Sequence, residues 1–140
     1  MNGYLGTLNP LDGADGAADG VYKEGGKAHS IVSSMSGFKS RGPSEIWVFL
    51  DEHKGTLNDG FFRVFMEFEG AQARMGDLPG WYHNGANGFS FADGHAEIHK
   101  WRDPRTRVPF NKDEQQTFSV PSPNNQDIAW MQSRTAERVQ

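Results

Sequence analysis

The alternation of apolar and polar positions predicts two antiparallel strands in the middle of the chain. Residues 45–50 carry apolar side chains on both faces, with Trp47 and Phe49 on one of them, which is typical of a strand at the centre of a sheet. Residues 61–68 follow after a turn at residues 58–60, and alternate positions in them are apolar. We therefore expect a second strand that pairs with the first.

The Asp93-Gly94 step between two β-rich runs predicts a β-hairpin with a two-residue turn, because a type I′ turn needs positive φ at both central positions. In that register Ala92 faces His95, and Phe89 faces Ile98. One face of the hairpin then collects the apolar side chains of Phe89, Phe91, Ala96 and Ile98. The other face collects His95, Glu97, His99 and Trp101.

The flanking segments carry weaker signals. Glycine interrupts every short apolar group of residues 1–27, so this segment is expected to be irregular. In residues 121–140, Asn124 or Asn125 can cap a short terminal helix whose Ile128 and Met131 pack inward. At 140 residues the chain is expected to form a single α+β domain, with an antiparallel sheet of about four strands, extended glycine-rich loops and a short C-terminal helix.

Composition and charge argue against several classes of partner. The chain carries 14 lysines and arginines against 18 acidic residues and has no basic cluster, which argues against binding to nucleic acid. It has no cysteine and therefore no disulfide. No apolar run approaches the roughly 18 residues of a membrane-spanning helix, and the first residues do not resemble a signal peptide. As given, the chain is expected to be cytoplasmic and to have no membrane segment.

Histidine and acidic residues on one strand face suggest a metal site. His95, Glu97 and His99 alternate along the second strand of the hairpin, and two imidazoles with one carboxylate suit iron, zinc or manganese. His83 can add a ligand if its loop folds over the hairpin, and Asp93 or Glu97 can act as ligand or base. Such a site would make a small metal-dependent hydrolase of esters or lactones, with a metal-bound water as nucleophile. The alternative is the polar, solvated outer face of a sheet.

Two other arrangements stay open at this point. Asp51 and Glu52 close the strand at residues 45–50 and lie next to His53, so they can form a general acid–base pair. A polar strand end explains the same residues without catalysis. A carbohydrate- or surface-binding module is a third possibility, with Trp81, Tyr82 and Trp101 as its aromatic platform.

Oxygen-rich side chains precede the predicted helix. Asn124, Asn125 and Asp127 lie in a proline-bordered loop, and such oxygens together with loop carbonyls are what calcium needs. Capping of the helix explains the same residues without an ion. The repeat DGADGAADG near the N-terminus lacks the ligand spacing of an EF-hand, and we expect it to be a solvated loop.

His83, nine further residues and then Asp93-Gly94 resemble the H-X9-DG domain associated with prepilin-type processing, found in pilin-like and pseudopilin-like bacterial proteins. Other stretches resemble that family too, in the family's order: MNGYLG, PSEIWVFLDE, NDGFF, HNGANGFSFADGHAEIHKW and NNQDIAWMQSRT. The resemblance implies the globular head of a pseudopilin-like subunit in a type II secretion or type IV pilus-like assembly, with other pseudopilin subunits as partners. Family members begin with a cleavable leader and a long apolar helix that anchors and polymerises them at the inner membrane, periplasm or cell surface. This chain resembles the head without that helix.

The same resemblance bears on individual residues. Major pseudopilins of type II secretion hold calcium in a C-terminal loop, and Asp127-Ile128-Ala129-Trp130 is similar to the end of that loop. Trp130 comes one residue earlier than in the family, and Gln126 stands where an acidic ligand is expected. The resemblance therefore implies calcium near Asp127. For His83 and Asp93 we expect a structural brace between a loop and the hairpin turn.

Overall fold

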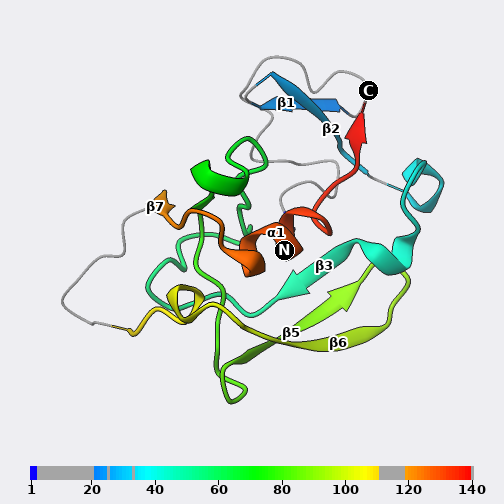
Figure 1. Ribbon diagram of the computed structural model, residues 1–140. Coiled ribbons are helices and arrows are strands. Elements are labelled where there is room, and N and C mark those ends of the chain that lie inside the picture. Colours follow the sequence, from blue (N-terminus) through cyan, green and yellow to red (C-terminus); the bar gives the residue numbers. More distant parts are fainter. Residues whose placement is uncertain (3–20, 25, 33, 111–118, 140) are drawn as a thin grey trace.

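Three small antiparallel sheets surround one short helix in the computed structural model, which describes residues 1–2, 21–24, 26–32, 34–110 and 119–139 (Figure 1). The first sheet has the order β1 (Val21–Glu24), β2 (Lys27–Ser30) and β8 (Arg138–Val139). The second has the order β3 (Trp47–Leu50), β5 (Ala86–Phe91) and β6 (Ala96–Lys100), and the third pairs β4 (Arg74–Met75) with β7 (Val120–Pro121). The helix is α1 (Gln126–Gln132), and the 3₁₀ turns are η2 (Met35–Gly37), η3 (Pro43–Glu45), η4 (Gly70–Gln72) and η5 (Pro104–Thr106).

Short antiparallel strands and one C-terminal helix are confirmed as the elements of the domain. The strands are divided among three sheets of two or three strands, however, and do not form one sheet of about four. The expectation that residues 1–27 are irregular is wrong at residues 21–24, because β1 pairs there with β2. The repeat DGADGAADG lies outside the described residues.

β3 is an edge strand of its sheet, and the expected central position is wrong. Its outer edge is covered by loop main chain, since Asn2 N–H donates to the Val48 carbonyl and Trp47 N–H donates to the Arg134 carbonyl. A register shift between Trp47 and Phe49 also separates these two residues: Trp47 is fully buried, whereas Phe49 is 56% exposed. A β-bulge changes the direction in which side chains point. Apolar residues on both faces of this strand therefore do not mean that both faces of the sheet are covered.

Residues 61–68 do not form the second strand that was expected. The apolar alternation is real, because Phe62, Val64 and Met66 are all buried. Side chains take over much of the hydrogen bonding that a neighbouring strand would supply. Arg63 N–H donates to the Asp77 carboxylate, and the Gln132 carboxamide donates to the carbonyls of Phe65 and Phe68.

The hairpin lies where the turn residues place it, but its register differs by one residue from the expected one. Phe91 N–H donates to the His95 carbonyl, so the loop has three residues, Ala92 to Gly94. Phe89 consequently faces Glu97, and Gly88 faces Ile98. Since side chains alternate across a strand, a shift of one residue exchanges the two faces of β6. Glu97 and His99 therefore lie on the side of Phe89, and Ile98 is 69% exposed on the opposite side.

Gly94 has φ +93°, and a Cβ added to it would meet no atom within 4 Å. Gly94→Val should therefore lower the free energy of unfolding by about 1–3 kcal/mol, through backbone strain alone. Gly60 is a matched control, because a Cβ there also meets nothing within 4 Å and its φ is not in the left-handed region. Chemical denaturation of both variants checks the prediction, and equal losses in the two would contradict the turn geometry.

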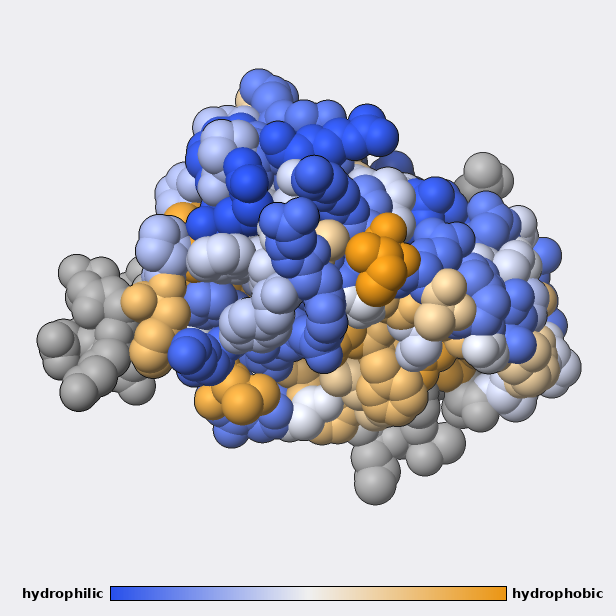
Figure 2. Space-filling model, turned by 90° about the horizontal axis from the view of Figure 1, so that it is seen from below, coloured by the Kyte–Doolittle hydropathy of each residue, from blue (hydrophilic) through white to orange (hydrophobic). Residues whose placement is uncertain are grey.

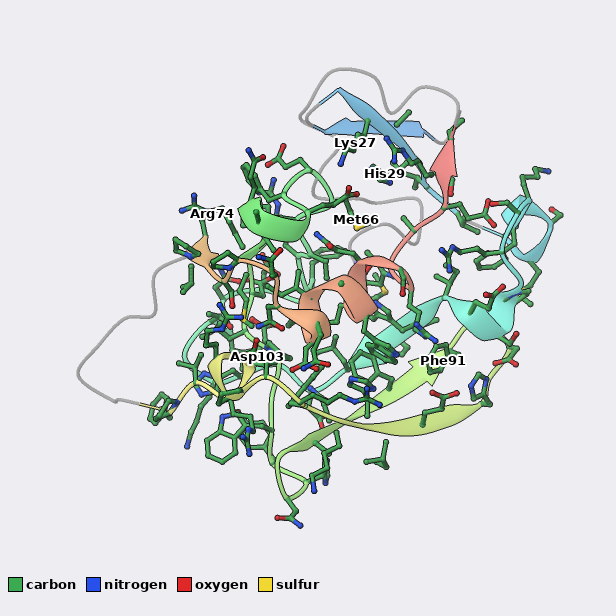
Figure 3. The ribbon with its side chains drawn as sticks, viewed as in Figure 1. Lys27, His29, Met66, Arg74, Phe91 and Asp103 are labelled. Atoms are coloured by element: carbon green, nitrogen blue, oxygen red, sulfur yellow. The ribbon has the colours of Figure 1, made fainter. Side chains whose placement is uncertain are left out.

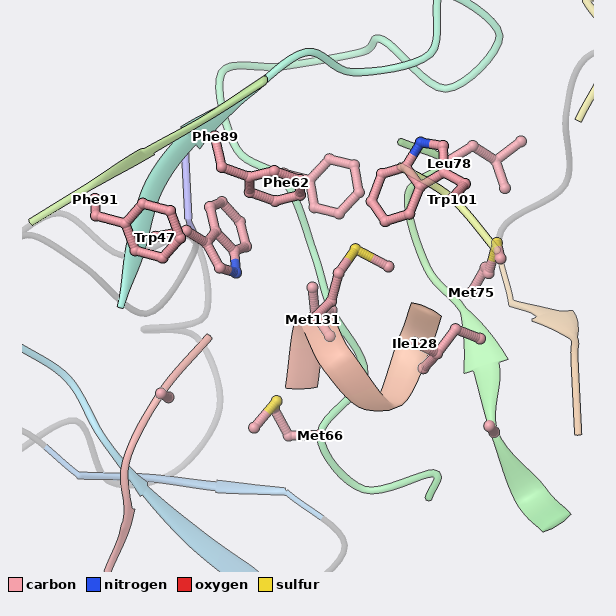
Figure 4. Close-up of a cluster of buried hydrophobic side chains, with 13 residues drawn as sticks. Trp47, Phe62, Met66, Met75, Leu78, Phe89, Phe91, Trp101, Ile128 and Met131 are labelled. Atoms are coloured by element: carbon pink, nitrogen blue, oxygen red, sulfur yellow. The ribbon is translucent and has the colours of Figure 1, made fainter. Parts of the chain in front are cut away.

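The main core joins α1 to the inner side of the β3–β5–β6 sheet (Figure 4). Ile128 and Met131 of α1 are buried in it, as the sequence predicted. Trp47 packs edge-on against Phe62 and Phe89, at centroid distances of 5.9 and 6.1 Å, and its indole N–H donates to the Thr135 hydroxyl. Asn125 caps the helix, because its Oδ1 accepts the N–H groups of Asp127 and Ile128.

Candidate functional site

The five residues of the expected catalytic set lie in three separate places. The first is the hairpin tip, where His95 Nδ1 is 2.5 Å from Asp93 Oδ1 and His95 Nε2 is 3.2 Å from Glu97 Oε1. The His95 ring stacks on Phe91 at a centroid distance of 4.4 Å. The hydrogen bonds that the His95 ring makes to the carboxylates of Asp93 and then Glu97 raise the pKa of His95. Both ring nitrogens thus face carboxylates, an arrangement that holds an imidazolium.

His83 lies at the opposite end of β5 from that tip. Its Nε2 is 3.1 Å from Asp51 Oδ2, at the end of β3, and both side chains are about half exposed. The hydrogen-bond partner of His83 is therefore Asp51, while Asp93 bonds to His95. The expected brace between His83 and the hairpin turn does not form, because the length of β5 separates them.

His99 forms the third place. Its ring stacks on Trp130 at 3.7 Å between centroids and lies edge-on to Phe89 and Trp101. His99 Nε2 is 3.9 Å from Asp127 Oδ1, which is beyond hydrogen-bonding distance. Figure 3 labels Phe91, at the tip end of β5, and Asp103, just before η5. His95 stacks on Phe91, and Asp127 accepts the main-chain N–H of Asp103. Among the described residues no three histidine, aspartate or glutamate side chains are grouped so that they could hold a metal ion.

Asp127 is buried at the start of α1 and collects hydrogen-bond donors. Its carboxylate accepts the N–H groups of Arg102 and Asp103 and the hydroxyl of Thr106, at 2.8–3.1 Å. Burial raises the pKa of Asp127, but the hydrogen bonds outweigh it, and the net shift is downward. The carboxylate thus ties the turn after β6 to the helix.

These donors do not suit the calcium site expected at Asn124, Asn125 and Asp127. Calcium needs oxygens whose lone pairs are free to point at the ion, and the Asp127 oxygens already accept N–H and O–H donors. Asn125 Oδ1 accepts two helix N–H groups, and its Nδ2 donates to Thr106 and Ser122. Asn124 lies at φ +55° in the preceding turn. The geometry fits a helix cap and a main-chain brace, not an ion cage.

Sequence reasoning missed a set of buried carboxamides that bond to main chain. Asn2 Nδ2 donates to the carbonyls of Trp47 and Thr135. Asn87 bonds to both the N–H and the carbonyl of Asp51 and to the Gly80 carbonyl. Gln132 bridges two carbonyls of residues 65–68. Each of these residues lies in one of the stretches that resemble the H-X9-DG family. The residue type alone does not reveal whether an asparagine or glutamine holds two segments together or simply forms a turn.

The expected acid–base pair at the end of β3 does not form around His53. His53 is buried, and its Nδ1 accepts the N–H of Gly55. Burial lowers the pKa of His53. Burial and the nearby charge of Asp77 raise the pKa of Glu52 to about 7, and burial raises the pKa of Asp77 to about 6. Among the described residues, the carboxyl groups whose pKa is raised are therefore Glu52 and Asp77.

Stability should fall as pH rises through these raised pKa values. The folded state holds the Glu52 proton up to about pH 7, whereas the usual value is 4.5, so deprotonation at higher pH favours unfolding. Glu52→Gln should flatten the fall in melting temperature between about pH 5 and pH 8. Glu45→Gln, at an exposed carboxylate, is the control. If the melting temperatures of Glu52→Gln and wild type fall equally with pH over this range, the raised pKa of Glu52 is not the cause of the fall.

Two surface features remain after these groups are placed. The outward side of the β3–β5–β6 sheet carries the exposed Phe49 and Ile98 around Gly88 and Ser90, with a hollow of about 380 Å³ between them. Figure 2, which views the molecule from below, shows apolar groups gathered over the lower part of that face and hydrophilic residues over most of its upper part. The second feature is a hollow lined in part by Trp81 and Tyr82. These are two of the three aromatic residues expected to form a binding platform; the third, Trp101, is buried in the core.

Comparison with protein-family models, curated proteins and solved structures finds no match. No helix in the described residues is long and apolar enough to cross a membrane.

Proposed function

We propose that this chain is the globular head of a pseudopilin-like subunit, in a type II secretion or type IV pilus-like assembly. The resemblance of His83-X9-Asp93-Gly94 and the flanking stretches to the H-X9-DG domain supplies the family. The observation that carries the proposal is the exposed apolar side of the β3–β5–β6 sheet, where Phe49 is 56% and Ile98 69% exposed. A subunit of an assembly needs such a surface to pack against another subunit or its helix.

The buried residues of the resembling stretches support the same function. Asn2, Asn87, Asn125 and Asp127 come from three of these stretches, and each bonds to main chain inside the domain. Their work is to hold loops together, which suits a structural subunit. The metal-dependent hydrolase of esters or lactones gains no comparable support, because His83, His95 and His99 point to three different partners.

The surface of Ile98 offers a direct test in a bacterium that assembles the proposed subunit. Ile98→Asp should abolish assembly while the melting temperature of the purified head stays the same, because an exposed substitution changes stability by only about 0.5 kcal/mol. Met35→Asp is the control, since Met35 is 59% exposed in η2, away from the sheet. Filament or secretion assays compare the two variants at equal expression. Normal assembly with Ile98→Asp would remove the proposed packing surface.

A further inference from the structure

An open hollow of about 750 Å³ lies between the turn at residues 81–85 and η5. Its lining residues are Trp81, Tyr82, Asn84, Gly85, Pro104 and Arg107. The volume is in the range of small-molecule sites. None of these residues belongs to the apolar sheet surface or to the buried braces, so the hollow is independent of the proposed function.

The aromatic side chains of the hollow are held in place. Tyr82 is 53% exposed, yet its hydroxyl accepts the Lys54 N–H and lies 3.3 Å from the Glu52 carbonyl, to which it donates. Its ring packs on Gly80, where an added Cβ would come within 2.7 Å of it. The Trp81 indole N–H donates to the Val108 carbonyl at 2.8 Å. A ring fixed in this way loses little conformational entropy when a ligand stacks on it.

Arg107 supplies a cation to the same hollow. Its side chain crosses Gly85, because a Cβ at Gly85 would lie 3.4 Å from Arg107 Cδ and 3.5 Å from a terminal nitrogen. Within the described part of the chain, no carboxylate forms an ion pair with Arg107, whereas the nearby Arg105 is paired with Asp103 at 2.6 Å. The Arg107 guanidinium is thus available for a bidentate bond to a ligand carboxylate.

We propose that this hollow binds a saccharide that carries a carboxylate. The C–H bonds on one face of a sugar ring are weakly positive and pack on the electron-rich faces of Tyr82 and Trp81. The Arg107 guanidinium pairs with the sugar carboxylate, and the exposed Asn84 carboxamide bonds to ring hydroxyls. The hollow is open, and the polar side chains of Asn84 and Arg107 share its lining with the aromatic rings, which favours a hydrated sugar over a compact apolar ligand.

Trigalacturonate and its neutral methyl ester are matched probes for the purified chain, because they differ in charge and hardly in size. Calorimetry should show the acid binding at least tenfold more tightly than the ester. Arg107→Gln should remove that difference, and Tyr82→Ala should weaken binding of the acid at least tenfold. Arg102→Gln, which removes an exposed cation elsewhere, and Phe49→Ala, which removes an exposed aromatic ring elsewhere, should change affinity less than twofold.

A sugar can carry its carboxylate directly on a ring carbon, as in trigalacturonate, or on an ether side chain, as in N-acetylmuramic acid. Binding of N-acetylmuramic acid is therefore measured as well, to distinguish these two kinds of acidic sugar. Binding of either acid that is lost in Arg107→Gln supports the site and identifies which kind it takes. If neither acid binds at about 10 mM, or if Arg107→Gln binds as tightly as wild type at an unchanged melting temperature, the proposal is wrong.

Discussion

Asp127→Ala is expected to lower the free energy of unfolding by about 3–5 kcal/mol, because it leaves one buried hydroxyl and two partly buried N–H groups without their acceptor. The N–H groups of Arg102 and Asp103 and the hydroxyl of Thr106 all donate to this carboxylate. These donors lie in the segment between β6 and α1, so the loss of their acceptor loosens the contact between the turn after β6 and the helix. Urea denaturation at pH 7 measures the loss.

Asp103→Ala is the control for Asp127→Ala. Asp103 pairs with the exposed Arg105 and caps η5, so its removal should cost only about 1 kcal/mol. A second measurement separates a main-chain brace from an ion site. Excess chelator should leave the melting temperature of the wild type unchanged. If chelator lowers the melting temperature of the wild type but not that of Asp127→Ala, this carboxylate holds a cation.

Asn87→Ala is expected to cost about 2–4 kcal/mol, the second large effect, because it combines a lost donor–acceptor pair with a small cavity. The side chain is fully buried and joins the end of β3 at Asp51 to the loop at Gly80. Asn58→Ala is the matched control, since Asn58 is exposed in a turn. Equal denaturation midpoints for the two variants would mean that the Asn87 carboxamide does not hold these segments together.

The hairpin shows how far the sequence predicts this fold. Asp93-Gly94 correctly locates the turn, because glycine is needed where φ is positive. The same two residues are compatible with a two-residue type I′ turn and with a three-residue loop that ends in a left-handed glycine. Only the second occurs here, with Gly94 as the left-handed residue. The choice depends on contacts outside the hairpin, such as Ala92 N–H donating to the Ile46 carbonyl.

The candidate sites were less predictable than the turn, for a related reason. Spacing along residues 95–99 predicts His95 and His99 on one face, but it does not predict that Phe91 stacks on the ring of His95 and Trp130 on the ring of His99. Nor does it reveal Asn2, whose partners lie in β3 and after α1. Alternation predicts which face a side chain occupies, whereas its partner comes from a distant segment. The helix cap at Asn125 was predictable because that contact is local.

The Asn2 carboxamide has a consequence for the order in which the domain forms. It donates to the carbonyl of Thr135, 133 residues further along the chain. The Gln132 side chain likewise reaches back to Phe65, 67 residues earlier. A chain dominated by such distant pairings folds slowly, because loop closure must precede the contacts that reward it. On the ribosome, the core around Trp47 cannot close until residues 125–136 have emerged, and until then its aromatic side chains stay open to chaperones and to aggregation.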